Sequence, residues 1–157
     1  MHHQHHYEAK IEWKGNRGKG TSAVDAYSRT HTVQIGSKPQ LELTTDNPLY
    51  GDKSMLNPED LLIASVASCH MMSYLYLCAK ARVVVLDYTD EAKGEMIEFE
   101  KGGGHFTSIT LNPVCTVADA SMVERAMRLH HKANEICYIA GSVNFKILHN
   151  ATVNIAS

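Results

Sequence analysis

The feature that most constrains the fold is an uncharged stretch over residues 61–79, with a helix-start signal directly before it. Asn57 suits the N-cap, Pro58 suits the first helical position, and the acids Glu59 and Asp60 complement the positive end of a helix dipole. The apolar residues of the stretch spread around the helical wheel instead of forming one stripe. The sequence therefore predicts a long central helix that other elements cover on most sides.

The same stretch approaches the length of a bilayer span, but polar and weakly polar residues interrupt it. These residues are Ser65, Ser68, Cys69, His70, Ser73, Tyr74, Tyr76 and Cys78. We therefore expect a helix inside a protein core and no membrane association. Residues 1–6 contain histidines where a secretory signal would have a basic residue followed by an apolar run. We therefore expect a cytoplasmic protein. We also expect this His-rich terminus to be flexible.

Length and charge narrow the class of protein further. A chain of 157 residues is the size of one ordinary domain, so we expect a single domain over 1–157. With 15 Lys plus Arg against 17 Asp plus Glu, the net charge is -2, and no polybasic stretch offers phosphate contacts. Nucleic acid is therefore not an expected partner.

Strand patterns flank the predicted helix on both sides. The predicted strands cover 6–13, 28–35, 40–44, 83–85, 92–99, 105–117 and 142–147. A second, amphipathic helix is expected from a Ser-x-x-Glu capping box at Ser121 to about Cys137. This order indicates an α+β fold with a mostly antiparallel sheet, because a Rossmann-type sheet would need regular alternation of strand and helix and a Gly-rich fingerprint.

The four cysteines are too few and too scattered for a secreted disulfide scaffold. Their ordinary interpretation is as small buried hydrophobic residues. Cys78 follows Cys69 by nine residues, about 13 Å along a helix axis, so an unbroken helix cannot join them by a disulfide. A disulfide partner of Cys69 would therefore be Cys137 or Cys115.

Three features together resemble the OsmC/Ohr family of organic hydroperoxide reductases over nearly the whole chain. They are the Asn57-Pro58-Glu59 helix start, Cys69 ten residues after Glu59, and the segment Cys137-Tyr138-Ile139-Ala140-Gly141-Ser142. The resemblance implies a thiol peroxidase in which Cys69 attacks the peroxide and Cys137 resolves the product to a disulfide. It also implies an intertwined homodimer with an OsmC-like fold, no bound cofactor, and an external dithiol reductant such as a lipoyl group.

The resemblance further implies an arginine that keeps the reactive thiol ionised and is held by Glu59. Arg29 and Arg17 are the two candidates, and we favour Arg29 because a strand fixes its direction better than the glycine-rich loop around Arg17. Ten residues of straight helix put Glu59 about 15 Å from Cys69 along the axis. We therefore hypothesise that a partner subunit contributes Glu59, the arginine, or both.

Residues near the reactive thiol have ordinary interpretations beside the functional ones. His70 points about 100° around the helix from Cys69, which suits a core or interface histidine as well as a supporting role. Asp52 is either a turn residue or part of the substrate pocket. The candidates for lining the pocket are His70, Met71, Met72 and Asp52. His130 and His131 lack nearby ligands, so no metal site is expected.

Two other functions fit a buried cysteine on this scaffold. A cysteine hydrolase or acyltransferase would use Cys69 with His70, although the sequence contains no recognisable acid to orient that histidine. A non-catalytic, stress-related binding dimer would keep the fold without peroxidase activity. The hydroperoxide that is preferred, the physiological reductant and the biological trigger cannot be read from the residues.

Overall fold

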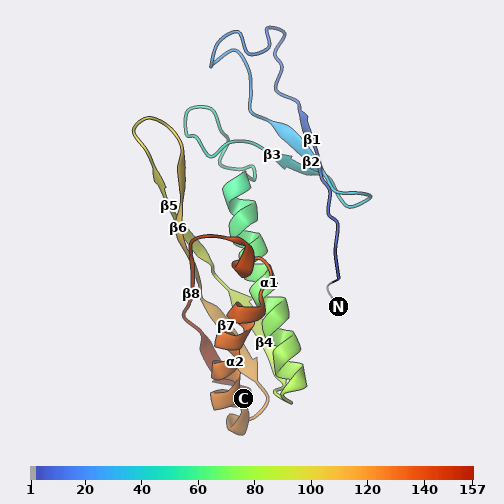
Figure 1. The fold of residues 1–157 in the computed structure, drawn as a ribbon, viewed down its shortest axis with the longest axis vertical. Coiled ribbons are helices and arrows are strands. Elements are labelled where there is room, and N and C mark those ends of the chain that lie inside the picture. Colours follow the sequence, from blue (N-terminus) through green and yellow to red (C-terminus); the bar gives the residue numbers. More distant parts are fainter. Residues whose placement is uncertain (1–2) are drawn as a thin grey trace. The chain divides into compact units, whose positions relative to one another are not determined.

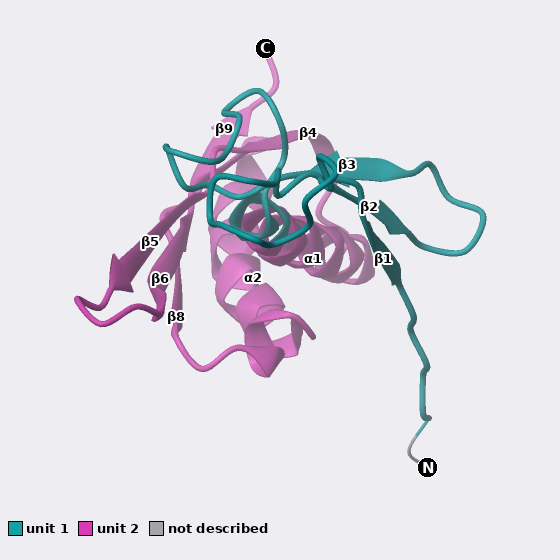
Figure 2. Ribbon diagram, turned by 90° about the horizontal axis from the view of Figure 1, so that it is seen from above, with its two compact units in different colours: residues 1–61 teal, residues 62–157 magenta. Residues whose placement is uncertain are grey.

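The computed structural model describes residues 3–157, which divide into two compact units, Met1–Leu61 and Leu62–Ser157 (Figure 2). The boundary falls inside a helix. Met1 and His2 of the predicted flexible terminus lie outside the described residues, and residues 3–9 form neither helix nor strand. Each unit is considered by itself below.

The α+β prediction is confirmed, with two α-helices and nine strands within residues 3–157 (Figure 1). The elements are β1 Lys10–Trp13, β2 His31–Gln34, β3 Leu41–Leu43, α1 Pro58–Lys80, β4 Val85–Asp90, β5 Lys93–Glu98, β6 Gly104–Leu111, β7 Pro113–Val117, α2 Val123–Ile136, β8 Lys146–His149 and β9 Thr152–Ile155. Short 3-10 turns, η1 Ala120–Met122 and η2 Ala140–Ser142, precede and follow α2.

The first unit holds an antiparallel sheet in the order β1-β2-β3. The strands are shorter than predicted, since β2 begins at His31 and not at Ser28. Arg29 therefore lies just before the strand. Its neighbourhood is still fixed, because the His31 ring nitrogen Nδ1 bonds to the Arg29 carbonyl at 2.8 Å.

The second unit contains two three-stranded sheets, in the orders β4-β7-β9 and β5-β6-β8. Each combines an antiparallel pair with a parallel one, β7 with β9 and β6 with β8. The predicted single strand over 105–117 is wrong, because Asn112 separates β6 from β7. The Asn112 side chain donates a hydrogen bond to the Glu91 carbonyl. The predicted strand over 142–147 is also displaced: η2 ends at Ser142, β8 begins at Lys146, and β9 was not predicted.

Helix α1 begins as its sequence predicts. Asn57 Oδ1 accepts the Asp60 N–H at 2.8 Å, and Asp60 Oδ2 accepts the Asn57 N–H at 3.2 Å, so the two side chains satisfy orphan N–H groups reciprocally. At the other end, Arg82 adopts a positive φ of 57°, and the Val83 N–H donates to the Cys78 carbonyl at 2.9 Å. This is a Schellman ending with arginine where glycine is usual, which is why the sequence did not predict it.

One face of α1 enters the core and another does not. The buried face carries Val66, His70, Tyr74 and Cys78, at helical spacing of four residues. Met72 is 59% exposed and Tyr76 is 58% exposed. The prediction that other elements cover the helix on most sides is therefore wrong for residues 3–157. By length and composition α1 could cross a membrane, but core helices share those properties, and its buried face packs into the second unit.

The predicted capping box of α2 is wrong. Asp119 caps this region instead: its Oδ1 accepts the Ser121 N–H at 2.8 Å and also bonds to the Ser121 hydroxyl. Ser121 thus lies in η1, and α2 starts two residues later, at Val123. The predicted end of the helix holds, because Cys137 is the C-cap of α2.

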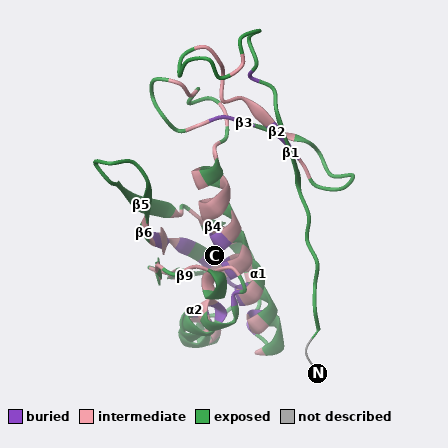
Figure 3. Cartoon of the chain, turned by 45° about the horizontal axis from the view of Figure 1, so that its top comes forward, coloured by how far each residue is buried: buried purple, intermediate pink, exposed green. Residues whose placement is uncertain are grey.

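The core of the second unit consists of two clusters of buried side chains. Buried positions along the chain are purple in Figure 3. The first joins α1, α2 and β7 through Tyr74, Cys78, Val83, Cys115, Val117, Ala126 and Ala133. The second joins α1 and β6 through Val66, Ile109 and Leu111. Both helices that carry the predicted reactive cysteines are therefore anchored in the core of one unit.

Candidate active site

Cys69 and Cys137 meet in the second unit. Cys69 lies in the middle of α1 and is partly exposed, whereas the C-cap residue Cys137 is only 2% exposed. Both are free cysteines. Burial raises the pKa of the Cys137 thiol to about 11, and a hydrogen bond with the Cys69 side chain, which favours the protonated form of Cys137, raises it further. The pair thus combines an accessible thiol with a protonated, sheltered one.

The turn after α2 surrounds Cys137 with backbone donors. The Ala140 N–H donates to Cys137 Sγ at 3.4 Å. Backbone hydrogen bonds from Ala140 and Ile139 lower the pKa of Cys137, although burial outweighs them. Such N–H groups stabilise negative charge on sulfur, so they favour the Cys137 thiolate at the moment when it must form.

The other two cysteines belong to the core. Tyr74 hydrogen-bonds to Cys115 Sγ at 3.3 Å, and Cys115 also contacts the Thr152 carbonyl at 3.7 Å. Burial raises the pKa of Cys78 to about 11 and raises that of Cys115 as well. The sequence left two possible partners open for Cys69, and in the structure Cys137 is the one whose thiol interacts with it.

Arg29 and Glu59 line one cavity of about 490 Å³ in the first unit. Its walls consist of Ile11, Trp13, Thr21, Tyr27, Arg29, His31, Thr44, Thr45, Pro58 and Glu59. The lining is mainly apolar, with one cation and one carboxylate, which is the pattern of a small-molecule site that orients a polar group. Arg17 is exposed in the glycine-rich loop and does not line this cavity.

Two aromatic rings fix the Arg29 guanidinium. Its Cζ lies 4.1 Å from the centre of the Tyr27 ring and 4.0 Å from that of Tyr50, a double cation–π contact. One guanidinium nitrogen donates to the Tyr27 carbonyl at 3.1 Å. Among the described residues Arg29 forms no salt bridge, so its charge is available to an anion.

The Trp13 indole completes the aromatic wall. It donates to the Ser28 carbonyl at 2.7 Å and meets the Tyr27 ring edge to face, with centres 5.7 Å apart. Sequence reasoning missed these aromatic residues. The only signal was Tyr27 two positions before Arg29, and Tyr50 gave none, because it reaches the guanidinium from a separate loop.

Glu59 occupies the first turn of α1, as predicted. Its Oε2 atom is buried and has no hydrogen-bond partner within residues 3–157. A buried carboxylate oxygen without a donor is destabilising, so a partner from a ligand or another chain would be favourable. Glu59 thus lines the cavity and also has one oxygen that still lacks a hydrogen-bond donor.

Residues 51–150 match the sequence profile of the OsmC-like protein family, about two thirds of the chain. The chain belongs to the OsmC-like family. An OsmC-like protein of unknown function from Vibrio cholerae has a similar structure, with 27% identity, a TM-score of 0.82, and coverage of 94% of this chain and 99% of that one. An organic hydroperoxide resistance protein from Elizabethkingia anophelis shares the fold at 20% identity and a TM-score of 0.69, with 99% and 100% covered. No curated protein matches in sequence.

The remaining predicted pocket residues of this OsmC-like protein take different positions. Asp52 Oδ1 accepts the Ser54 N–H at 2.8 Å and the Ser54 hydroxyl at 2.6 Å, which is the turn role. These bonds lower the pKa of Asp52. His70 is 1% exposed and bonds to His130, so its ring enters the core. Met71 is half-buried and Met72 exposed, both on α1.

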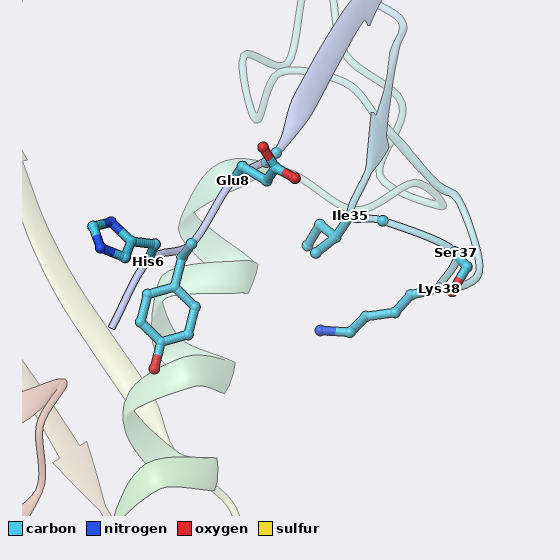
Figure 4. Close-up of a pocket in the computed structure, with 8 residues that line it drawn as sticks. His6, Glu8, Ile35, Ser37 and Lys38 are labelled. Atoms are coloured by element: carbon cyan, nitrogen blue, oxygen red, sulfur yellow. The ribbon is translucent and has the colours of Figure 1, made fainter. Parts of the chain in front are cut away.

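A second cavity in the first unit, about 690 Å³, contains none of the predicted site residues. His6 and Glu8 line it from the segment before β1, and Ile35, Ser37 and Lys38 line it from the turn between β2 and β3 (Figure 4). In this OsmC-like protein no three His, Cys, Asp or Glu side chains of the described residues are grouped closely enough to hold a metal ion.

Proposed function

We propose that this OsmC-like protein is a thiol peroxidase that reduces organic hydroperoxides to alcohols. The observation that carries the proposal is the contact between a partly exposed Cys69 and a buried Cys137. A peroxidase of this type needs one sulfur that a substrate can reach. It also needs a second sulfur close enough to capture the oxidised first one before further oxidation.

The chemistry balances with these two sulfurs and one external dithiol. The Cys69 thiolate attacks the distal oxygen of ROOH, the O–O bond breaks, and the alkoxide leaves as the alcohol after taking a proton. The sulfenic acid on Cys69 then condenses with the Cys137 thiol, forming the S–S bond and releasing water. A dithiol such as a lipoyl group reduces the disulfide by exchange and becomes oxidised itself.

Arg29 and Glu59 are the proposed activating pair. Attack requires a thiolate, which a guanidinium stabilises and an apolar surrounding does not. The shared cavity supports Arg29 over Arg17, because the rings of Tyr27 and Tyr50 hold the Arg29 charge at a cavity that Glu59 also lines. The apolar walls suit the alkyl part of an organic hydroperoxide better than hydrogen peroxide.

We further propose a cytoplasmic homodimer that needs no bound cofactor and has neither nucleic acid nor membrane as a partner. The exposed apolar side chains on α1 support the dimer, since a contiguous apolar face is favourable to cover. In the dimer a partner subunit would supply Arg29, Glu59 or both to each Cys69. The structurally similar protein from Elizabethkingia anophelis is an organic hydroperoxide resistance protein, which is consistent with this function.

The test is turnover of an alkyl hydroperoxide with a dithiol reductant in two variants. Cys69→Ser should abolish activity, because no sulfur remains to attack. Cys137→Ser should permit one turnover and then accumulate sulfinic acid on Cys69, which mass spectrometry detects. Cys78→Ser is the matched control, and it should keep turnover because Cys78 belongs to the core. Wild-type turnover in Cys69→Ser would refute the proposal.

The competing functions predict other products. In a hydrolase His70 would activate Cys69, but within residues 3–157 no hydrogen bond joins the two side chains, and the His70 ring is buried against His130 with Nε2 and Nδ1 3.2 Å apart. After one equivalent of organic hydroperoxide, a Cys69–Cys137 disulfide supports the peroxidase. Unchanged thiols would support the binding dimer instead, and an acyl adduct formed from an ester would support the hydrolase.

A further inference from the structure

A polar network crosses the core of the second unit at the place where α1 meets α2. His130 is fully buried, and its Nδ1 lies 3.2 Å from His70 Nε2. Its ring stacks on Tyr74, with ring centres 3.8 Å apart and planes at 8°. On its other side, Nε2 lies 3.9 Å from Cys115 Sγ. One imidazole therefore touches two α1 side chains and one from β7.

Only one order of donors and acceptors satisfies the hydrogen bonds of this network. If His70 Nε2–H donates to His130 Nδ1, then His130 Nε2–H can donate to Cys115 Sγ, and the Cys115 thiol can donate to the Thr152 carbonyl. The opposite direction would leave a buried N–H at His70 Nδ1, which has no partner among the described residues. An orphan lone pair is tolerated better than an orphan donor. The network is therefore directional, and it joins α1, α2, β7 and β9.

Both reactive cysteines lie close in sequence to this network. Cys69 is adjacent to His70 on α1. Cys137 follows His130 by seven residues, about two helical turns, so the two residues lie on the same side of α2. A second bond joins α2 to the residue that follows α1: Arg125 donates to the Ala81 carbonyl at 2.9 Å, near the start of α2. Of these two bonds, the His130 bond is nearer to Cys137.

We propose that His130 is a positioning residue that, through His70 and Tyr74, fixes how α2 lies on α1 and thereby holds Cys137 Sγ against Cys69. The inference rests on the proposed function only in that it concerns the same pair of sulfurs. A rotation or slide of α2 would move its C-cap residue Cys137 away from Cys69. The contact between His130 and His70 opposes that movement, so it raises the effective concentration of one thiol at the other when the disulfide forms.

The test measures the thiol–disulfide equilibrium of Cys69 and Cys137 in a glutathione or dithiothreitol redox buffer, without any peroxide. His130→Phe keeps an aromatic ring but removes its polar contacts. The effective concentration of the pair should fall about tenfold, as the loss of one buried hydrogen bond predicts. His131→Phe is the matched control on the same helix, where the side chain is 77% exposed, and it should leave the equilibrium unchanged.

Two further variants separate positioning from general loss of stability. His130→Asn places an amide where Nδ1 was, keeps a bond to His70, and should recover most of the loss. Ile109→Val weakens the other core cluster and should not move the equilibrium. If His130→Phe does not fold, His130→Gln replaces it with the same expected fall, because its amide reaches the Nε2 position instead.

The outcomes separate this inference from the proposed function. A wild-type disulfide together with an unchanged equilibrium in folded His130→Phe overturns the positioning role and leaves the peroxidase intact. Equal losses in His130→Phe and His130→Asn also overturn it, because the bond to His70 would then be irrelevant. A wild-type pair that never forms a disulfide overturns both. A disulfide without hydroperoxide turnover overturns the proposed function alone.

Discussion

At the scale of single residues, the environment of Arg29 explains why one arginine is a better activating group than another. Its guanidinium is held between Tyr27 and Tyr50, so little side-chain entropy is lost when it meets an anion. Arg17 is exposed, and a flexible exposed cation interacts weakly with its partners in water. The difference lies in immobilisation and burial, since both residues carry the same charge.

This difference predicts the reactivity of Cys69 in two variants. In Arg29→Ala, alkylation of Cys69 by iodoacetamide at pH 7 should slow about tenfold, because a neighbouring charge worth about 1.4 kcal/mol changes the thiolate population by that factor. Arg17→Ala is the matched control and should react as wild type does. The rate is followed by mass spectrometry of the Cys69 peptide. Slowing in Arg17→Ala alone would transfer the role to Arg17.

At the scale of elements, α1 has two faces with different partners. The face with Val66, His70, Tyr74 and Cys78 is buried in the second unit. Met72, Leu75 and Tyr76 are exposed, and their spacing of three and four residues places them along one stripe. A stripe of this kind on a helix is typical of a surface that another protein surface covers.

We therefore expect a charge on this stripe to weaken the proposed homodimer. Tyr76→Glu should shift the dimer toward monomer by at least tenfold in dissociation constant, because a carboxylate would be desolvated at the interface. Val24→Glu is the control, a matched substitution of a residue that is 64% exposed outside α1. Analytical ultracentrifugation over a concentration series measures both. A wild-type protein that is monomeric yet fully active contradicts the dimer and the shared site.

At the scale of the whole molecule, the buried histidines couple stability to pH. Burial, with a smaller contribution from His149, lowers the pKa of His70 to about 4. Burial also lowers the pKa of His130 to about 3, with smaller contributions from His70 and His149. The ordinary pKa of histidine is near 6.5, so below that pH the unfolded chain binds protons that the folded chain does not. Stability is therefore full above about pH 6.5 and is lost as the pH falls toward 4.

The expected size of this loss follows from linkage. When the pH is lowered from 7 to 5, each histidine that stays neutral in the folded state should lower the unfolding free energy by roughly 2 kcal/mol. Urea unfolding at several pH values measures the slope. His130→Phe should have a shallower slope, whereas His131→Phe, at an exposed position, should keep that of the wild type. An unfolding free energy independent of pH over this range would contradict neutral burial of the pair.

Much of the fold could be predicted because the signals are local. The cap formed by Asn57 and Asp60, the start of α1 at Pro58 and the end of α2 at Cys137 depend on residues a few positions apart. The predicted bounds of helices and strands were wrong where a distant or competing hydrogen-bond partner determined the local structure. Asp119 displaced the Ser121 capping box, and Asn112 broke a strand pattern that periodicity alone extends through it.

The sequence by itself determined where the long helix begins and which class of fold forms, and it singled out Cys69 and Cys137 through a resemblance to the OsmC/Ohr family. Only the tertiary structure decided that Cys137 and not Cys115 lies against Cys69, that Arg29 and not Arg17 shares a cavity with Glu59, and that His70 bonds to His130. The reason is the range of the interactions. Capping and periodicity act within one or two turns, whereas these contacts join segments far apart in the chain, whose meeting depends on how the whole core packs.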